Sequence, residues 1–529
     1  MTTFRDSNVV VIDTGRTLIR AGLGLHELLK PPAIQVTARV GLRRDALASG
    51  SAATAVKDYL VGTHLDEALS ANADIVVSWP FAEGYIKDWI QAEALWKYVL
   101  FNQLQRRRVQ NESPVLLSIA PGLSRDEYER ICQMFFERFN VAGFSVLERP
   151  MGQLYAANSL SGVVVDIGQF QTDITPIYDG FIARQARIST AVGSSDCEHY
   201  LAYLLRSNQS VMAAISPPDA PLEPQDAHPI LVQLASQVWR EGHVKVPSDG
   251  ETAAPEDEGV TDIAAVIVAG KERALIESGM KKRATAKASA AEQARAREIE
   301  ALDLITVQFR DQSITLGKER HRFCEPLFDP TLLRIIPAAF RESSPQSAGV
   351  LPWSLQEAVG HAVSQTDVDQ RQYIWGGLFV TGECTQQVKG IGIALQSRVA
   401  SFLVNPDLQT DVQTRASRVL NVPDYFPEYR DTGNGFAAFL GASITAKITF
   451  SDGKSFVTKA DYSTRGPRPA LLLERETTQM RCDDITTLLE LASHPHPQAT
   501  LPHIFNSAKN LEFRAEAPPS PPQLPSLRS

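Results

Sequence analysis

The sequence has few cysteines and no closely spaced pair of them. Five cysteines are spread over 529 residues, at Cys132, Cys197, Cys324, Cys384 and Cys482. Because no CxxC motif occurs, the pattern argues against zinc ribbons and disulfide-based scaffolds. An odd number of dispersed thiols is typical of proteins in a reducing compartment such as the cytosol or nucleus.

Long hydrophobic runs and an excess of positive charge are also lacking. No apolar stretch reaches the roughly 20 residues that a membrane-spanning helix needs, and the N-terminal residues do not form the pattern of a secretory signal. The formal net charge is -9, which argues against a protein whose whole surface binds DNA or an anionic membrane. The ten histidines show no metal-ligand spacing, and no Ser/His/Asp arrangement stands out.

Apolar runs that are typical of buried strands alternate with helical patterns along the first third of the chain. Strands are expected at 9–15, 73–80, 113–121 and 162–168, and helices at 84–108, 124–139 and 150–159. Ser124 and Glu127 form a capping-box pattern at the start of the second helix. The alternation of strands and helices predicts an α/β protein.

One motif occurs twice, each time directly after an apolar strand. Asp13-Thr14-Gly15 follows the first strand, and Asp166-Ile167-Gly168 follows the strand that begins near Val163. The repetition predicts two related halves that face one another. Two strand-end carboxylates can hold a nucleotide phosphate and its Mg²⁺ between them, whereas in the alternative interpretation Asp-x-Gly only makes a tight turn.

The stretch from about 206 to 311 has a different composition. It contains Pro- and Asp-rich segments that predict loops, and an Ala/Lys/Arg/Glu-rich segment that favours helix. Lys281–Arg283 could serve as a nuclear import signal, a nucleic-acid contact shared with Arg295–Arg297, or a solvated helix face. The Pro/Ser-rich residues 513–529 predict a disordered tail.

Several stretches together resemble actin and the actin-related proteins. VVVIDTGRTLIRAGL and VVVDIGQFQTDITPIYDGF resemble the two phosphate loops of the family, ITLGKERHRFCEPLFDP is nearly the family's own sequence, and LFVTGECT stands at its adenosine-side glycines. The resemblance implies the actin/hexokinase/Hsp70-like fold, in which two α/β halves surround a central nucleotide cleft. It implies a large insertion as well.

The same resemblance implies a division of the chain. Residues 1–156 would form the first half with subdomains 1 and 2, and residues 157–435 the second half with subdomains 3 and 4. The insertion would cover about 208–310. Residues 436–512 would return to subdomain 1, ahead of the disordered tail.

The resemblance also assigns nucleotide-binding positions, all of them in a degenerate site: Asp13, Thr14, Gly15, Arg20, Asp166, Gly168 and Gly382. Several family residues are replaced. Arg16 stands in place of the phosphate-binding serine, Arg149 in place of the catalytic glutamine, and Asp173 in place of the water-positioning histidine. Gln169, Phe170 and Glu383 are further departures. We therefore expect that ATP hydrolysis is lost. We assign no catalytic residue, no metal ligand and no cofactor. Mg²⁺–ATP is the cofactor that the fold family would suggest.

The pattern is similar to the divergent fungal nuclear actin-related subunits of the SWI/SNF and RSC chromatin-remodelling complexes. This implies a noncatalytic nuclear scaffold that supports transcription regulation and contacts chromatin indirectly, with no membrane partner. Its partners would be a helix of the remodeller ATPase and a second actin-related protein, forming a heterodimer. A helix-in-groove contact would use the cleft residues Tyr155, Phe181, Ile444 and Ile448. The alternatives are a cytoplasmic dynactin subunit and a nucleotide-switched actin-like ATPase.

Overall fold

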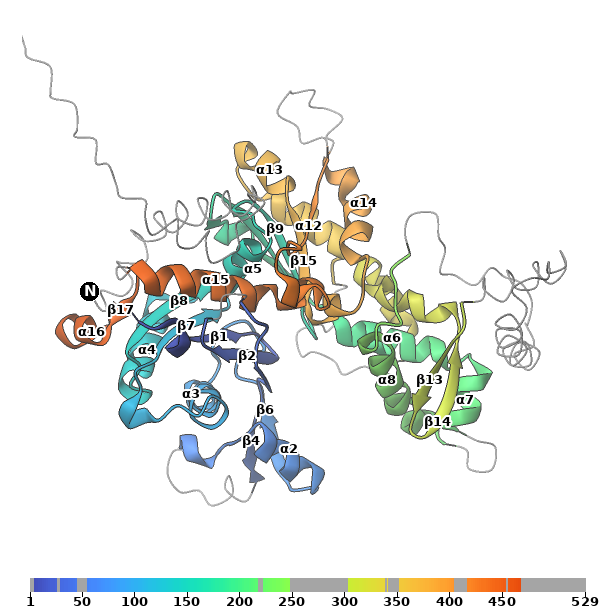
Figure 1. Cartoon of the computed structure of the whole chain (residues 1–529). Helices are drawn as coiled ribbons and strands as arrows, with labels where there is room; N and C mark the ends of the chain where they lie inside the picture. Colours follow the sequence, from blue (N-terminus) through green and yellow to red (C-terminus); the bar gives the residue numbers. More distant parts are fainter. Residues whose placement is uncertain are drawn as a thin grey trace, which may run out of the picture.

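The structure is a computed structural model of the whole chain (Figure 1). It describes residues 4–25, 29–44, 55–216, 222–247, 303–337, 340, 352–403, 416–452 and 455–467. The stretches Lys281–Arg283 and Arg295–Arg297 and the predicted tail at 513–529 lie outside the described residues.

The first large sheet contains the N-terminal strand of the chain. Its strand order is β17-β8-β7-β1-β2-β3, with bounds β1 (Val10–Thr14), β2 (Leu18–Leu23), β3 (Ile34–Thr37), β7 (Pro114–Ile119), β8 (Gly143–Glu148) and β17 (Val457–Thr458). β1 is buried along its whole length, as its unbroken apolar run predicts. It pairs antiparallel with β2 and parallel with β7.

The second large sheet repeats this local arrangement. Its order is β11-β10-β9-β15-β16, and β12 pairs with β10. The bounds are β9 (Gly162–Ile167), β10 (Thr172–Tyr178), β11 (Phe181–Ile182), β12 (Ile188–Thr190), β15 (Leu378–Gly382) and β16 (Val419–Leu420). β9 pairs antiparallel with β10 and parallel with β15. In each sheet a central strand, β1 or β9, forms an antiparallel hairpin with the next strand in the sequence and pairs parallel with the strand on its other side. The fold therefore has two related α/β halves.

Two helices lie where the sheets approach one another. α5 (Arg149–Ala156) and α15 (Ala437–Asp452) pack closely together, and Figure 1 shows α15 crossing beside α5. Gly441 is required at this contact, because an added Cβ would lie 1.7 Å from the carbonyl oxygen of Gly152. The hydrophobic cluster around these helices includes Val11 of β1 and Val164 of β9, so it joins the two halves.

Two predicted helices of the first half are present with corrected bounds. α3 (Trp89–Lys97) begins five residues later than the predicted start at 84, because the Asp88 side chain caps it by accepting from the N–H groups of Ile90 and Gln91. It continues as a π-helical turn, Tyr98–Gln103, so the helix ends before the predicted end at 108. α4 (Arg125–Gln133) has the predicted capping box between Ser124 and Glu127.

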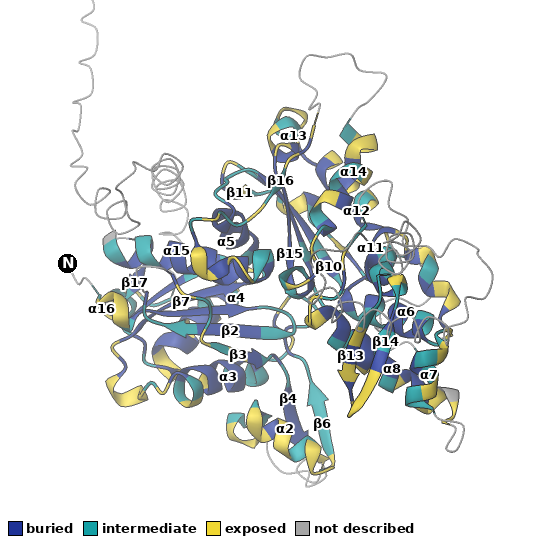
Figure 2. Cartoon of the chain, turned by 45° about the vertical axis from the view of Figure 1, so that its right-hand side comes forward, coloured by how far each residue is buried: buried dark blue, intermediate teal, exposed yellow. Residues whose placement is uncertain are grey.

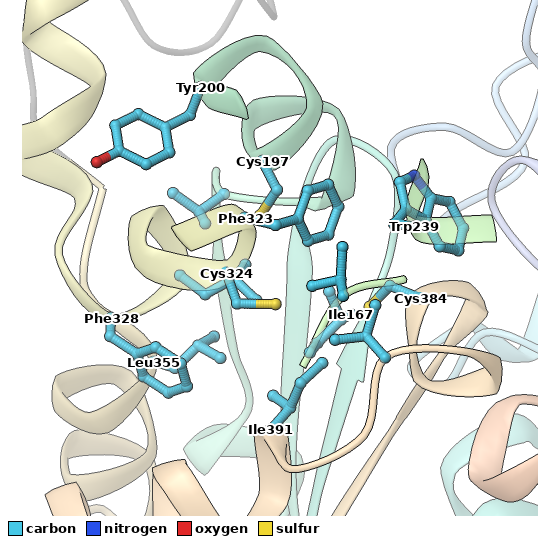
Figure 3. Close-up of a cluster of buried hydrophobic side chains, with 14 of the residues drawn as sticks. Ile167, Cys197, Tyr200, Trp239, Phe323, Cys324, Phe328, Leu355, Cys384 and Ile391 are labelled. Atoms are coloured by element: carbon cyan, nitrogen blue, oxygen red, sulfur yellow. The ribbon is translucent and has the colours of Figure 1, made fainter. Parts of the chain in front are cut away.

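The second half has its own hydrophobic core. Three elements within the range 208–310 contribute to it: α7 (Gln209–Ile215), α8 (Pro224–Arg240) and β13 (Ile305–Phe309). α8 packs on α6 (Ser194–Leu205) because its apolar face, including Leu231 and Leu234, is fully buried. Figure 3 shows part of this core, where Trp239 and Cys197 lie near Ile167 at the end of β9.

The remaining elements extend the two halves. The first half has a small sheet, β4 (Val40–Arg43), β5 (Leu60–Val61) and β6 (Ile75–Ser78), with α2 (Thr63–Ser70) and the C-terminal α16 (Lys459–Arg465). The second half has β14 (Gln312–Leu316), α11 (Glu325–Phe328), α12 (Leu355–Ser364), α13 (Val368–Trp375) and α14 (Ile391–Leu403). The central strands of the large sheets, such as β7 and β15, are fully buried, whereas the edge strands β3 and β16 are more exposed (Figure 2).

Candidate functional site

The two Asp-x-Gly turns lie on either side of the junction between the halves. Each turn connects the two strands of a hairpin and is closed by a backbone hydrogen bond. The Gly15 N–H donates to the carbonyl of Leu18 at 2.9 Å, and the Gly168 N–H donates to the carbonyl of Gln171 at 3.0 Å. The carbonyl of Gly168 accepts from the N–H of Ser194, at the N-terminus of α6. Because these turn groups bond within the protein, the two glycine N–H groups are committed to the turns.

Arg149 links the carboxylates of the two turns. It is the first residue of α5. In the sequence, α5 follows β8 of the first sheet and precedes β9 of the second sheet. Its Nε donates to Asp13 Oδ1 at 3.0 Å, and its Nη1 donates to Asp166 Oδ2. Gln153, one helical turn later, donates to the same oxygen of Asp166 at 2.8 Å. The side chains are 16% exposed for Arg149, 1% for Asp13 and 15% for Asp166, so the bridge is largely shielded from solvent.

Asp13 has further partners in its own sheet. Ser118 of β7 donates to its Oδ1 at 3.1 Å, and Arg20, directly opposite on β2, lies 3.9 Å from its Oδ2. Burial lowers the pKa of the Arg20 guanidinium below its usual range, and the charge of Asp13 acts in the opposite direction. The Arg20 guanidinium also lies over the ring of Phe436, 5.0 Å from its centre.

A second ion pair crosses the junction beside the first. Arg16, in the β1–β2 turn, donates from Nε and Nη2 to the two oxygens of Asp173 on β10, each at 2.8 Å. Its Nη1 donates to the carbonyl of Ala82 at 2.9 Å. Gly84 adopts a φ of +81°, and an added Cβ there would lie 2.6 Å from Arg16 Nη1, so glycine makes room for the guanidinium. Burial raises the pKa of Asp173, but Arg16 and Ser189 more than reverse this and hold it below its usual range.

Two other predicted positions have contacts unrelated to a ligand. Thr14 accepts a hydrogen bond of 3.0 Å from the indole of Trp96, so its hydroxyl faces the interior of the first half. Gly382 has a φ of +125°, and an added Cβ would lie 2.1 Å from the carbonyl oxygen of Ile167. Glycine is therefore required there for β15 to approach β9. Glu383, the next residue, lies 3.7 Å from Arg240 of α8.

The cavity between the turns is small. Its lining includes Gly15, Arg16, Arg149, Asp166 and Asp173, and its volume is about 30 Å³. A cavity of this size holds roughly two water molecules, whereas small-molecule clefts are typically about 300–1,000 Å³. The guanidinium groups of Arg16 and Arg149 occupy the space between the two turns.

Sequence reasoning identified the turn residues but missed the ion pairs between them. The structure brings Asp13, Thr14, Gly15 and Asp166 together around Arg149, and places Gly382 outside the cavity lining. A signal was present in the sequence: the departures from the family pattern include both cations, Arg16 and Arg149, and an anion, Asp173.

The predicted partner cleft consists of residues around α5 and α15. Tyr155 of α5 and Ile444 of α15 are buried, with 4% and 5% exposure. Ile448, one turn later, is half-buried against the same cluster. Phe181 on β11 is 49% exposed. Tyr155, Ile444 and Ile448 thus share one apolar cluster, and Phe181 is the member with the most surface available to a partner.

The described residues contain no group of three or more His, Cys, Asp or Glu side chains placed to hold a metal ion. Within the same residues, no helix is both long enough and apolar enough to cross a bilayer.

Comparisons with known proteins agree with the fold. Residues 4–230 match the family model described as Actin. The chain is 26% identical over 549 residues to the SWI/SNF and RSC complexes subunit arp9 of Schizosaccharomyces pombe, covering 88% of this chain and 99% of that protein. It is 23% identical over 459 residues to actin-related protein 7 of Oryza sativa subsp. indica, covering 87% of this chain and 97% of that protein.

A third match is more local. Actin-related protein 2 of Saccharomyces cerevisiae is 30% identical over 198 residues, which are 37% of this chain and 49% of that protein. The similarity to subunit arp9 and to actin-related protein 7 therefore extends much further along the chain. Residues 4–230 are thus similar to the Actin family model, and over most of its length the chain is similar to the SWI/SNF and RSC subunit arp9.

Proposed function

We propose that this protein is a noncatalytic structural subunit of a nuclear ATP-dependent chromatin-remodelling complex of the SWI/SNF and RSC type, where it supports transcription regulation. The observation that carries this proposal is the match to subunit arp9, which extends over 99% of that protein. A match over the full length favours a shared role in an assembly more strongly than a match to one module does.

The contacts at the two turns support the absence of ATP hydrolysis. Actin-type hydrolysis depends on positioning a water and a hydrated metal ion. In our alignment with the family pattern, Arg149 would replace the catalytic glutamine and Asp173 the water-positioning histidine. Arg149 bonds to Asp13 and Asp166, and Asp173 bonds to Arg16. Because Arg149 and Asp173 are each held in ion pairs with other side chains, neither one is available to orient a water.

We assign the contact with the remodeller ATPase to the cleft beside α5 and α15. An amphipathic helix binds by placing its apolar face in a hydrophobic groove. Tyr155 and Ile444 would form the floor of this groove, Ile448 its wall, and Phe181 its exposed rim, in keeping with their burial. A second actin-related protein would complete the complex, and chromatin would be contacted through it and the ATPase.

Affinity purification of the tagged full-length chain from its native cells, followed by mass spectrometry, tests this function. Recovery of a remodeller ATPase together with a second actin-related protein is expected, and imaging should place the tagged chain in the nucleus. Recovery of dynein–dynactin subunits with nuclear exclusion would instead establish the dynactin alternative. Recovery of the chain alone, with ATP turnover that is lost on Asp13→Asn substitution, would establish the actin-like ATPase.

A further inference from the structure

We propose that Arg149 takes the place of a divalent cation between Asp13 and Asp166, and that together with Arg16 it holds the two halves of the protein closed without nucleotide. The fold family implies Mg²⁺–ATP in this cleft, and the residues present do not fit it. This proposal concerns the cleft alone, so its test does not depend on which complex the chain joins.

The geometry of Arg149 is that of a bridge. Asp13 ends a strand of the first sheet and Asp166 a strand of the second, and Arg149 donates to both from adjacent nitrogens. A guanidinium is always charged and presents several donors in one plane, so it can neutralise two carboxylates on different elements. Hydrated Mg²⁺ would have to occupy the same position between these oxygens, since magnesium is usually bound through one or two carboxylates.

The charges around Arg149 balance without any ligand. Asp166 and Asp173 are direct neighbours across the β9–β10 ladder, a pairing of like charges that is unfavourable by itself. Each receives a guanidinium from the first half: Arg149 for Asp166 and Arg16 for Asp173. Asp13 has Arg20 beside it as well. Three carboxylates face these three guanidinium groups and a fourth, that of Arg187, which also lines the cavity. No net negative charge is left to attract a metal ion or to offset its desolvation.

Arg16 adds a second connection between the halves. It reaches from the β1–β2 turn to Asp173 with two donor nitrogens, while its third nitrogen bonds to Ala82. The guanidinium therefore ties the first turn, the segment before α3 and the second sheet together. Paired donors of this kind fix orientation as well as distance. A nucleotide holds an actin-type cleft closed from outside the chain, and here two arginines do so from within it.

Thermal unfolding of the full-length chain tests the bridge. The Arg149→Gln variant in EDTA should unfold at a temperature about 5–10 °C below the wild type. It leaves Asp166 without a cation and Asp13 with only the more distant Arg20, in a site shielded from solvent. Millimolar Mg²⁺ or Mn²⁺ should then restore part of the loss, as a ligand that binds only the folded state does. The wild type should show no shift with either ion.

Arg184→Gln is the matched control. Arg184 also pairs across the two halves, with Glu148 at 2.9 Å, but its side chain is 56% exposed, and exposed pairs contribute little. This variant should unfold within a degree or two of the wild type and should not respond to divalent ions. If Arg149→Gln behaves like this control, or if the wild type is stabilised by Mg²⁺, the proposal is wrong.

A double variant keeps the test decisive if Arg149→Gln does not fold. Adding Asp166→Asn removes one of the two carboxylates that the single variant leaves facing each other. The double variant should recover stability relative to Arg149→Gln and should lose the response to divalent ions. Additive losses from the two substitutions would contradict the bridge, since they would mean that the two side chains act independently.

Discussion

The guanidinium of Arg16 donates two hydrogen bonds of 2.8 Å to the carboxylate of Asp173, which lies 157 residues further along the chain. The two side chains belong to different sheets, so their pairing is a property of the closed cleft. Their exposed fractions are 17% and 27%, which places the pair between a surface salt bridge and a buried one.

A double-mutant cycle on this pair should give a clear coupling energy. Arg16→Gln and Asp173→Asn should each lower the free energy of unfolding. The decrease in the double variant should be smaller than the sum of the two single decreases by roughly 1–3 kcal/mol. Urea unfolding of the four proteins measures this difference. A coupling energy indistinguishable from zero would show that the pair does not stabilise the closed arrangement.

His228 predicts a loss of stability in mild acid. Burial, the neighbouring His199 and Arg206 lower the pKa of His228 to about 4, and its Nε2 lies 3.0 Å from Nδ1 of His199. The unfolded chain binds a proton at this side chain near pH 6.5. The stabilisation is therefore complete above about pH 6.5 and decreases as the pH falls towards 4.

The expected contribution of His228 is roughly 1–3 kcal/mol between pH 7 and pH 4. Urea unfolding at a series of pH values should show a steeper decline for the wild type than for His228→Gln, whose side chain does not titrate. The two curves should converge as the pH is lowered. Parallel curves over this range would mean that His228 keeps its ordinary pKa in the folded protein.

The described residues on the two sides of 248–302 are held together by Arg320 and His321. Nδ1 of His321 accepts from the N–H of Lys245 at 3.0 Å, and its Nε2 lies 2.7 Å from Asp303 Oδ2. Arg320 is buried and donates to the carbonyls of His243 and Asp303. The described residues on both sides of this segment therefore meet at one point.

Replacing 248–302 with a short Gly/Ser linker should leave the fold intact, with an unfolding temperature within a few degrees of the wild type. Arg320→Ala in the full-length chain should cost more, about 3 kcal/mol or above, because the carbonyls that it contacts would lose a buried charged donor. Circular dichroism melting of both proteins checks this. A deletion more damaging than Arg320→Ala would contradict the assignment of Arg320 as the tie.

Phe181 allows the proposed helix contact to be tested without disturbing the core. Phe181→Asp should weaken binding of the remodeller ATPase helix by about tenfold or more, the equivalent of about 1.4 kcal/mol. The fold should be unaffected, since the side chain is 49% exposed. Ile393→Asp is the control, because Ile393 is 62% exposed and lies on α14, which packs on β15 and β16 at the opposite edge of the sheet from β11. Equal effects of the two substitutions would remove Phe181 from the interface.

Local signals in the sequence were enough to predict much of the fold. The unbroken apolar run before Asp13 predicted a fully buried strand, and the Ser124–Glu127 spacing predicted a helix start, because both depend on neighbouring residues. The start of α3 was misjudged because Ile86 fits the helical spacing, whereas the Asp88 cap decides the boundary. The range assigned to the insertion stays a prediction, and the apolar face of α8 within it packs in the core of the second half.

The ion pairs could not be predicted in the same way. Arg149 and Asp13 are 136 residues apart, and only the packing of α5 between the two sheets brings them together. The sequence showed Arg16 as a bulky charge in a phosphate loop and Asp173 as a replaced histidine, each as a separate departure. Arg16 and Asp173 carry opposite charges, and each replaces a family residue. If such replacements are treated as potential ion-pair partners, the sequence alone links these two positions.

The most direct test of the account is to measure whether the native protein holds or responds to nucleotide. The full-length chain is purified without added nucleotide, its acid extract is analysed by chromatography, and its unfolding temperature is measured in Mg²⁺–ATP and in EDTA. We predict no nucleotide in the extract and the same unfolding temperature in both conditions, because Arg16 and Arg149 already close the cleft. A stoichiometric nucleotide, or a rise of several degrees in Mg²⁺–ATP, would contradict the account.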